Sequence, residues 1–277
     1  MNNKKNKNYV YRYSLFTYLT FWVGIILVGV IYLLTNNDWL MRILTIPLSW
    51  IPTIVLFVMF KKLLPNENKK EWVKKSFSSK VNVGLVISVT LAFILPVVFT
   101  YLIMSFSDST VEKFDISSLS VSFIITEIVF AIVTGATGEE LGWRGFLQRH
   151  YEKENCGNVI KASLKVGLIW SFWHLPLWFT STAGESIDFM LNHIITFFIM
   201  NMSLSIIISI CYKRCRNIFI PMLIHFIANV SVALVYPYFT SNSAIMGGKL
   251  WISLFYVAVA VIFVLWYENK KESIDNI

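Results

Sequence analysis

Charged residues are scarce in this 277-residue chain, and their scarcity restricts the class of protein. Only 14% of the residues are Asp, Glu, Lys or Arg, and 56% are hydrophobic, whereas soluble domains carry about 25% charged residues. A soluble fold of this length could not bury so much apolar surface. Apolar runs of about 20 residues, the length that spans a bilayer, recur along the chain. The composition therefore predicts an integral membrane protein.

Cysteine is rare as well, and two other features are missing. The three cysteines are an odd number and fall in segments expected at the cytoplasmic side, which argues against disulfides and a cysteine-bound zinc. The chain has no internal repeat and lacks the H-E-x-x-H spacing of soluble zinc proteases. The net charge of +8 comes from basic residues between apolar runs, where membrane topology places them. Nucleic acid is therefore not an expected partner, whereas the lipid bilayer is.

Eight apolar runs have spanning length, which predicts an all-α polytopic bundle in one membrane domain, residues 1–277. Polar connectors separate the runs, and the longest cover residues 61–80 and 139–161. The predicted spans are roughly residues 14–34, 40–60, 81–106, 117–138, 162–180, 188–212, 217–238 and 249–267.

The basic residues predict the orientation of these spans. If the N-terminus is cytoplasmic, 21 of the 24 Lys and Arg residues lie on the inner side, and only Arg42, Lys113 and Lys249 lie outside. Cytoplasmic segments carry such an excess of positive charge. An even number of spans then places both termini in the cytoplasm. The polar N-terminus runs into the first span without a small-residue cleavage pattern, so it is expected to act as a retained anchor.

Ionisable side chains within spans are costly and are functional hypotheses by default. The densest group is Glu139-Glu140-Leu-Gly-Trp-Arg144. On a helix Glu140 lies over Arg144, four residues on, and the two are expected to pair. Glu139 points about 100° away, so we expect an exposed carboxylate without a partner. The glycines at 135, 138, 142 and 145 form a stripe that lets another backbone approach. The alternative is that Glu140 and Arg144 only hold two helices together.

Two further spans contribute imidazoles. His174 lies two residues before Pro176, which should kink the helix and free the carbonyl of Phe172. His225 and Asn229 share one helix face, one turn apart. Each has a structural alternative, because a buried histidine can simply bond a carbonyl and a polar pair can join helices. Glu139, His174 and His225 each lie roughly 14–15 Å from a cytoplasmic cationic flank, so they could share one layer. Glu127 and His193 are expected outside this site.

A carboxylate, two imidazoles and a carboxamide in a dry cavity suit hydrolysis of an amide. Glu139 would act as general base on water, with His174 holding that water. His225 and Asn229 would donate hydrogen bonds to the oxyanion, and Glu140 with Arg144 would fix the helix that carries Glu139. A second mechanism remains open, in which Glu139, His174 and His225 bind zinc and a metal-bound water attacks.

The order and spacing of these residues resemble the CPBP family of CAAX-processing and bacteriocin-processing intramembrane proteases, also called Abi. The family pattern is E-E-x-x-x-R, F-x-x-x-H and H-x-x-x-N. Glu139 to Arg144 and His225 to Asn229 match fully, and Trp170 replaces the phenylalanine before His174, which keeps an aromatic wall. The resemblance covers residues 120–235, the expected catalytic core. It implies an eight-helix bundle, a glutamate acting on water, and a peptide or membrane-protein substrate.

Localisation and two rival functions complete these expectations. We expect an integral protein of the bacterial cell membrane whose site is reached from the cytoplasmic side and cleaves near the cytoplasmic leaflet. One alternative is a catalytically silent membrane scaffold or immunity protein, which would keep its function after Glu139→Ala. The other is a proton-coupled secondary transporter, which the absence of repeated halves disfavours.

Overall fold

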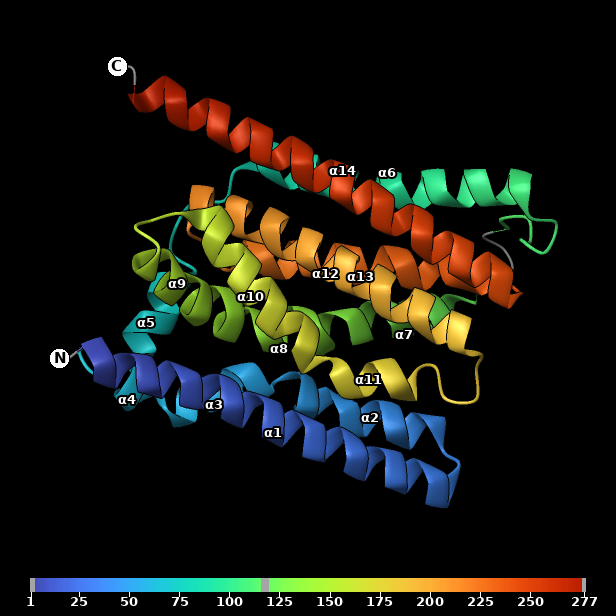
Figure 1. Cartoon of the computed structure of the whole chain (residues 1–277), viewed down its shortest axis with the longest axis horizontal. Coiled ribbons are helices and arrows are strands. Elements are labelled where there is room, and N and C mark those ends of the chain that lie inside the picture. Colours follow the sequence, from blue (N-terminus) through green and yellow to red (C-terminus); the bar gives the residue numbers. More distant parts are fainter. Residues whose placement is uncertain (1–2, 116–119, 276–277) are drawn as a thin grey trace.

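The computed structural model describes residues 3–115 and 120–275, and within these ranges it is built from helices. The only β-type pairing described is an isolated bridge between Val111 and Phe239. Most helices run nearly along one axis, and both termini lie at the same end of the bundle (Figure 1). The prediction of an all-α polytopic protein is confirmed. That the termini share one end agrees with an even number of crossings.

The N-terminal half supplies three of the predicted spans. The first is one unbroken helix, while the second is interrupted near Trp50, before Pro52 at the second position of α3. Connector 61–80 is not irregular throughout, because Asn68 caps a short helix there through the backbone N–H groups of Lys70 and Glu71. The elements are α1 (Asn3–Thr35), α2 (Asp38–Ser49), α3 (Ile51–Val58), α4 (Phe60–Leu63), α5 (Lys69–Ser76) and α6 (Val83–Ser107).

The C-terminal half carries the motifs. Span 117–138 starts in residues 116–119, which lie outside the described part of the chain, and its helix begins at Val121. The elements are α7 (Val121–Ala131), η2 (Ile132–Ala136), α8 (Thr137–Glu140), η3 (Leu141–Gln148), α9 (Arg149–Glu154), α10 (Val159–Trp173), α11 (Leu175–Thr180), α12 (Ile187–Cys215), α13 (Phe219–Val235), η4 (Tyr236–Tyr238) and α14 (Asn242–Asp275).

Seven helical segments of the described chain are long and apolar enough to cross a membrane. The eighth predicted span, residues 162–180, is divided at His174 into α10 and α11, and each part alone is too short to span. The break agrees with the predicted effect of Pro176, which occupies the second position of α11.

The predicted connector 139–161 is wrong over most of its length. The chain stays helical from Thr137 to Glu154 and leaves only residues 155–158 between α9 and α10. Glu140 and Arg144 pair at 3.1 Å inside the bundle, so this charged stretch continues as a helix within the protein rather than as a solvated connector.

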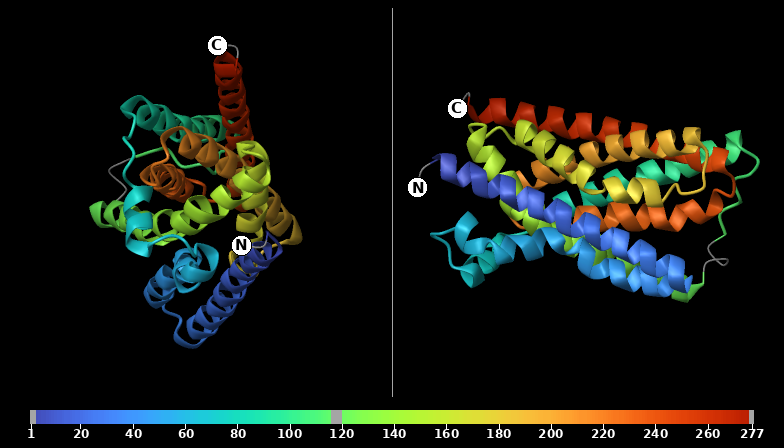
Figure 2. Two further views of the ribbon diagram at one scale, coloured as in Figure 1. Left: turned by 90° about the vertical axis from the view of Figure 1, so that its left-hand side faces the viewer. Right: turned by 60° about the horizontal axis from the view of Figure 1, so that its bottom comes forward.

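One large cluster of buried side chains connects the N-terminal and C-terminal helices. It joins Tyr13 of α1, Leu56 of α3 and Phe93 of α6 to Trp143 and Trp170 in the motif segments. Large apolar side chains such as Leu33, Val58 and Phe106 face outward instead, as expected where lipid covers the surface. In both views of Figure 2 the helices that carry the motifs lie between the N-terminal helices and α14. The site residues are therefore held in a packed interior.

Candidate active site

The helix that carries the first motif is broken just before the two glutamates. Thr134 and Gly135 leave helical geometry, with φ/ψ of −102°/150° and 60°/−80°, and the chain resumes at Thr137. The segment Leu141–Gln148 that follows is wound as a π-helix, a form that often occurs at functional sites. Glu139 and Glu140 thus sit on a short turn between two irregularities, which sets their direction independently of the outer helix α7.

Glu139 is buried, and the expectation of an exposed carboxylate without a partner is wrong. The residue is 3% exposed. Its Oε2 accepts hydrogen bonds from two indole N–H groups, at 3.1 Å from Trp143 and 2.5 Å from Trp170. Its Oε1 makes no hydrogen bond within the described residues, yet it is not among the fully enclosed polar atoms. One oxygen is therefore held in place while the other remains accessible.

Glu140 and Arg144 form the predicted pair, and Glu140 also holds a site histidine. Both side chains are 0% exposed, and Nη1 of Arg144 lies 3.1 Å from Oε1 of Glu140. The same oxygen lies 2.8 Å from Nδ1 of His225 on α13. No local sequence pattern indicates this second contact, because it joins residues 85 positions apart. Glu140 and Arg144 lie behind the cavity described below rather than in its lining.

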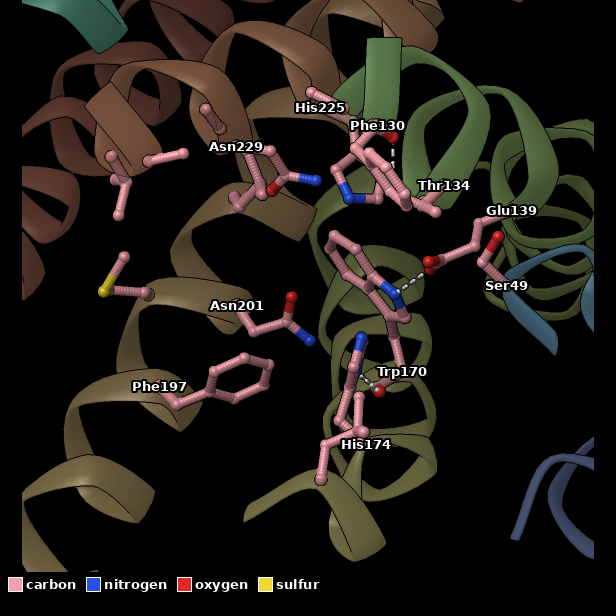
Figure 3. Close-up of a pocket in the computed structure, with 18 of the residues that line it drawn as sticks. Ser49, Phe130, Thr134, Glu139, Trp170, His174, Phe197, Asn201, His225 and Asn229 are labelled. Carbon is pink, nitrogen blue, oxygen red and sulfur yellow. Dashed lines mark hydrogen bonds between the residues drawn. The ribbon is translucent and has the colours of Figure 1, made fainter. Parts of the chain in front are cut away.

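Trp170 contacts Glu139, Arg144 and both histidines of the candidate site. Its indole N–H donates to Glu139, and its ring lies under the Arg144 guanidinium, 4.2 Å from the ring centroid. The ring centroids of His225 and His174 are 5.1 Å and 6.0 Å away. Figure 3 shows the Glu139 carboxylate pointing at the indole nitrogen. The residue expected to supply only an aromatic wall therefore also supplies a donor that phenylalanine lacks.

The contacts of His174 fit both expectations, a buried histidine bonded to a carbonyl and a histidine available to hold water. Its Nδ1 lies 2.8 Å from the carbonyl oxygen of Trp170, so the ring is fixed by the carbonyl of the preceding turn. The other ring nitrogen makes no hydrogen bond within the described residues, and the residue lines the cavity. With the proton on Nδ1, Nε2 is free to accept a hydrogen bond from water.

His225 and Asn229 face the break at Gly135. A Cβ added at Gly135 would lie 3.1 Å from Nε2 of His225 and 3.3 Å from Nδ2 of Asn229. Glycine is required here both for its φ of +60° and for this close approach. The predicted glycine stripe therefore holds only in part: Gly138 and Gly142 do meet the backbone of Ser49 and Pro52, but Gly135 serves the histidine and asparagine instead.

Four of the six predicted catalytic residues line one cavity of about 590 Å³, namely Glu139, His174, His225 and Asn229. In Figure 3, Asn201 and Asn229 lie on the opposite side of the aromatic rings from Glu139. The predicted convergence of three spans is thus observed. Glu127 and His193, which were expected outside the site, line the same cavity farther along. Depth along separate helices assigns residues to layers across the bundle, whereas this cavity runs along the bundle. Glu127 and His193 were therefore not expected in it.

The three predicted zinc ligands, Glu139, His174 and His225, have other contacts in the structure. Among the described residues, no group of three or more His, Cys, Asp and Glu side chains is arranged to hold a metal ion. Glu139 directs Oε2 to two indoles, and Nδ1 of His174 is held by a backbone carbonyl. Nε2 of His174 and Nε2 of His225 make no hydrogen bond among the described residues, and zinc binding stays a prediction.

Comparison with known proteins agrees with the motifs. Residues 121–231 match the model of the Rce1-like family, described as type II CAAX prenyl endopeptidase Rce1-like. This region is therefore similar to the Rce1-like family of CAAX prenyl endopeptidases. Over 234 residues the chain is 29% identical to CAAX prenyl protease 2 of Methanococcus maripaludis, and the match covers 79% of each chain. The resemblance to CPBP proteases is confirmed, and the chain is a membrane protease. Its substrate is accordingly a peptide or protein in the membrane.

Proposed function

We propose that this protease hydrolyses a peptide bond inside the bundle with water activated by Glu139. The observation that carries the proposal is the state of that carboxylate: Oε2 is fixed by two indole donors, and Oε1 remains accessible in a cavity shared with two histidines. A general base must reach the proton that it removes and must be held in position. Glu139 fulfils both conditions.

The remaining residues take roles that their contacts support. His174, with Nδ1 on the Trp170 carbonyl, presents Nε2 to the attacking water. The carboxamide of Asn229 makes no hydrogen bond within the described residues and faces the cavity, so it is available to donate to the oxyanion. His225 is oriented toward the same place by Glu140, and Glu140 is in turn paired with Arg144. Glu139 then returns its proton to the leaving amine, which completes hydrolysis with one water consumed.

Metal assistance is not part of this proposal. The cleaved bond would lie at the depth expected from the sequence, roughly 14–15 Å from the cytoplasmic flanks, if the termini are cytoplasmic. The protein would reside in the cell membrane with both ends inside. The identity of the peptide substrate is left to the experiment below.

The proposal is tested by comparing the peptides of membranes that contain wild-type protein, Glu139→Gln or Glu67→Gln. Gln keeps the shape of Glu139 but cannot act as base, whereas Glu67 is exposed and far along the chain from the motifs. We expect specific peptides that appear with wild type and Glu67→Gln and are missing with Glu139→Gln, and that are still produced after chelator treatment. Unchanged peptides together with an unchanged cellular phenotype in Glu139→Gln would support the scaffold alternative and refute the proposal.

A further inference from the structure

A second cleft lies at the end of the bundle that holds the termini, and it shares no residue with the cavity at Glu139. Its volume is about 510 Å³, and its walls come from the start of α6, the end of α12 and the C-terminal part of α14. α14 packs on both other helices. In Figure 1 its C-terminal part diverges from the rest of the bundle. The cleft is therefore a feature separate from the candidate active site.

One side of this cleft is cationic. Lys80 lies just before α6, Arg214 lies in the last turn of α12, and both line the cleft. No Asp or Glu of the described chain lines it with them. The ion pairs described at this end of the bundle use Lys165, Lys213 and Arg216, and none involves Lys80 or Arg214. Two positive charges thus border the cleft without a carboxylate beside them among the described residues.

The start of α6 adds to the positive potential on this side. Asn82 and Gly84 line the cleft, and the Asn82 side chain caps the helix by accepting from the backbone N–H of Leu85 at 3.0 Å. The N-terminus of a helix carries a partial positive charge and favours phosphate groups nearby. The helix start and the two basic side chains therefore attract the same kind of ligand.

The other side of the cleft is apolar. It is formed by Leu85 on α6 and by Ile262, Phe263 and Trp266 on α14. Ile262 is 62% exposed, so this wall is open to lipid. The Trp266 ring joins the two sides, because the guanidinium of Arg214 lies 4.5 Å from its centroid. A ligand that fills the cleft has to carry both an anionic and an apolar part.

The two sides lie at different depths of the membrane. Lys80 precedes the candidate span Val83–Ser107, and Arg214 is next to the last residue of the candidate span Ile187–Cys215. Both cations are therefore placed at the level of the lipid headgroups. Ile262 lies seven residues, or roughly 10 Å, inside the end of the candidate span Asn242–Asn269. The cleft thus extends from the headgroup level into the hydrocarbon.

We propose that this cleft binds one anionic phospholipid. Its phosphate lies between Lys80 and Arg214 at the start of α6, and an acyl chain runs along Leu85, Ile262 and Phe263. Basic pockets between transmembrane helices bind anionic lipid headgroups in this way. A free phosphate would use only the cationic side and leave the apolar wall uncovered. The site does not depend on the proposed hydrolytic mechanism.

Native mass spectrometry of the purified protein in detergent tests the headgroup. We expect the first dioleoylphosphatidylglycerol to bind about tenfold or more tightly than dioleoylphosphatidylcholine, because each basic residue near the surface attracts anionic lipid. The double variant Lys80→Gln, Arg214→Gln should lose most of this preference. The control Lys62→Gln, Lys161→Gln removes the same charge from exposed positions that line no described cleft, and it should keep the preference. Equal preferences in the two double variants would overturn the site.

The apolar side is tested by filling the cleft without changing its charge. Ser88 is exposed and lines the cleft, so Ser88→Trp should remove the preference for phosphatidylglycerol. Ser105→Trp, at an exposed position near the other end of α6, should keep it. Glycerol 3-phosphate should not compete with the lipid. Competition by glycerol 3-phosphate, or full binding by Ser88→Trp, would show that a phosphate alone occupies the site and would refute lipid binding.

A native thiol reports occupancy of the cleft directly. Cys215 lines it, whereas Cys156 is exposed and does not. Phosphatidylglycerol should slow alkylation of Cys215 by about threefold or more relative to phosphatidylcholine, since a bound lipid covers the thiol, and should leave Cys156 unchanged. Lys80→Gln with Arg214→Gln should abolish this protection. Lipid binding without protection of Cys215, or equal protection of both thiols, would place the lipid elsewhere and contradict the proposal.

Discussion

At the scale of single residues, the position of one carboxylate depends on an indole. Phenylalanine is usual at position 170 in the resembling family, and the tryptophan here bonds Glu139 and lies under Arg144. Hydrogen bonds to charged groups contribute about 1.5–3 kcal/mol. Trp170 is thus best described as a positioning residue, since it acts through Glu139.

Trp170→Phe is expected to lower kcat roughly 10- to 100-fold with little change in KM, which corresponds to the loss of one such bond. The matched control is Trp173→Phe. Trp173 is also buried and contacts the His174 ring, but its indole nitrogen has no hydrogen-bond partner among the described residues. Steady-state kinetics should therefore separate the two variants. Equal losses in both would mean that the Trp170 N–H has no special role.

A second residue-scale prediction concerns Glu140, which is shared by Arg144 and His225. Glu140→Gln leaves a fully buried guanidinium without its counter-charge and should destabilise the protein by about 3–5 kcal/mol. Thermal unfolding in detergent measures the effect. Lys165→Gln, which breaks the partly exposed pair with Glu154, should cost about 0–1 kcal/mol. Similar unfolding temperatures for the two variants would contradict the buried network.

At the scale of elements, the break in the motif helix places the catalytic residues. Gly135 turns the chain where it passes His225 and Asn229, and Glu139 lies in the same cavity one turn later. Pro176 divides α10 from α11 with a similar result for His174. Both irregularities border the cavity, which fits the general association of distorted helices with function.

Gly135→Ala should abolish most activity, because it combines backbone strain of about 1–3 kcal/mol with a clash against the His225 ring. Gly157→Ala is the matched control: its φ is +82°, but a Cβ there would meet nothing within 4 Å. Both variants are expected to lose stability, and only Gly135→Ala should lose peptide release. Comparable activity of the two folded variants would show that the contact with the site is unimportant.

At the scale of the whole molecule, composition and charge were sufficient to predict a membrane protein, a helical bundle and two termini at the same end of it. Three motifs at similar depth on separate spans were enough to predict that Glu139, His174, His225 and Asn229 lie around one cavity. The burial of Glu139 could not be predicted, since its indole partners depend on packing between helices. The extension of the cavity from Glu139 to Glu127 and His193 was also missed, because helical periodicity does not indicate a cavity that runs along the bundle.

The central claim is that water activated by Glu139 attacks the peptide carbonyl, and isotopic labelling of the product tests it most directly. Membranes that contain wild-type protein or Glu139→Gln are incubated in H₂¹⁸O, and the masses of the released peptides are measured by mass spectrometry. Wild type should place one ¹⁸O in the newly formed C-terminal carboxyl group, and the variant should form this product at least about 100-fold more slowly. A product without ¹⁸O, or one formed equally fast by the variant, would contradict the mechanism.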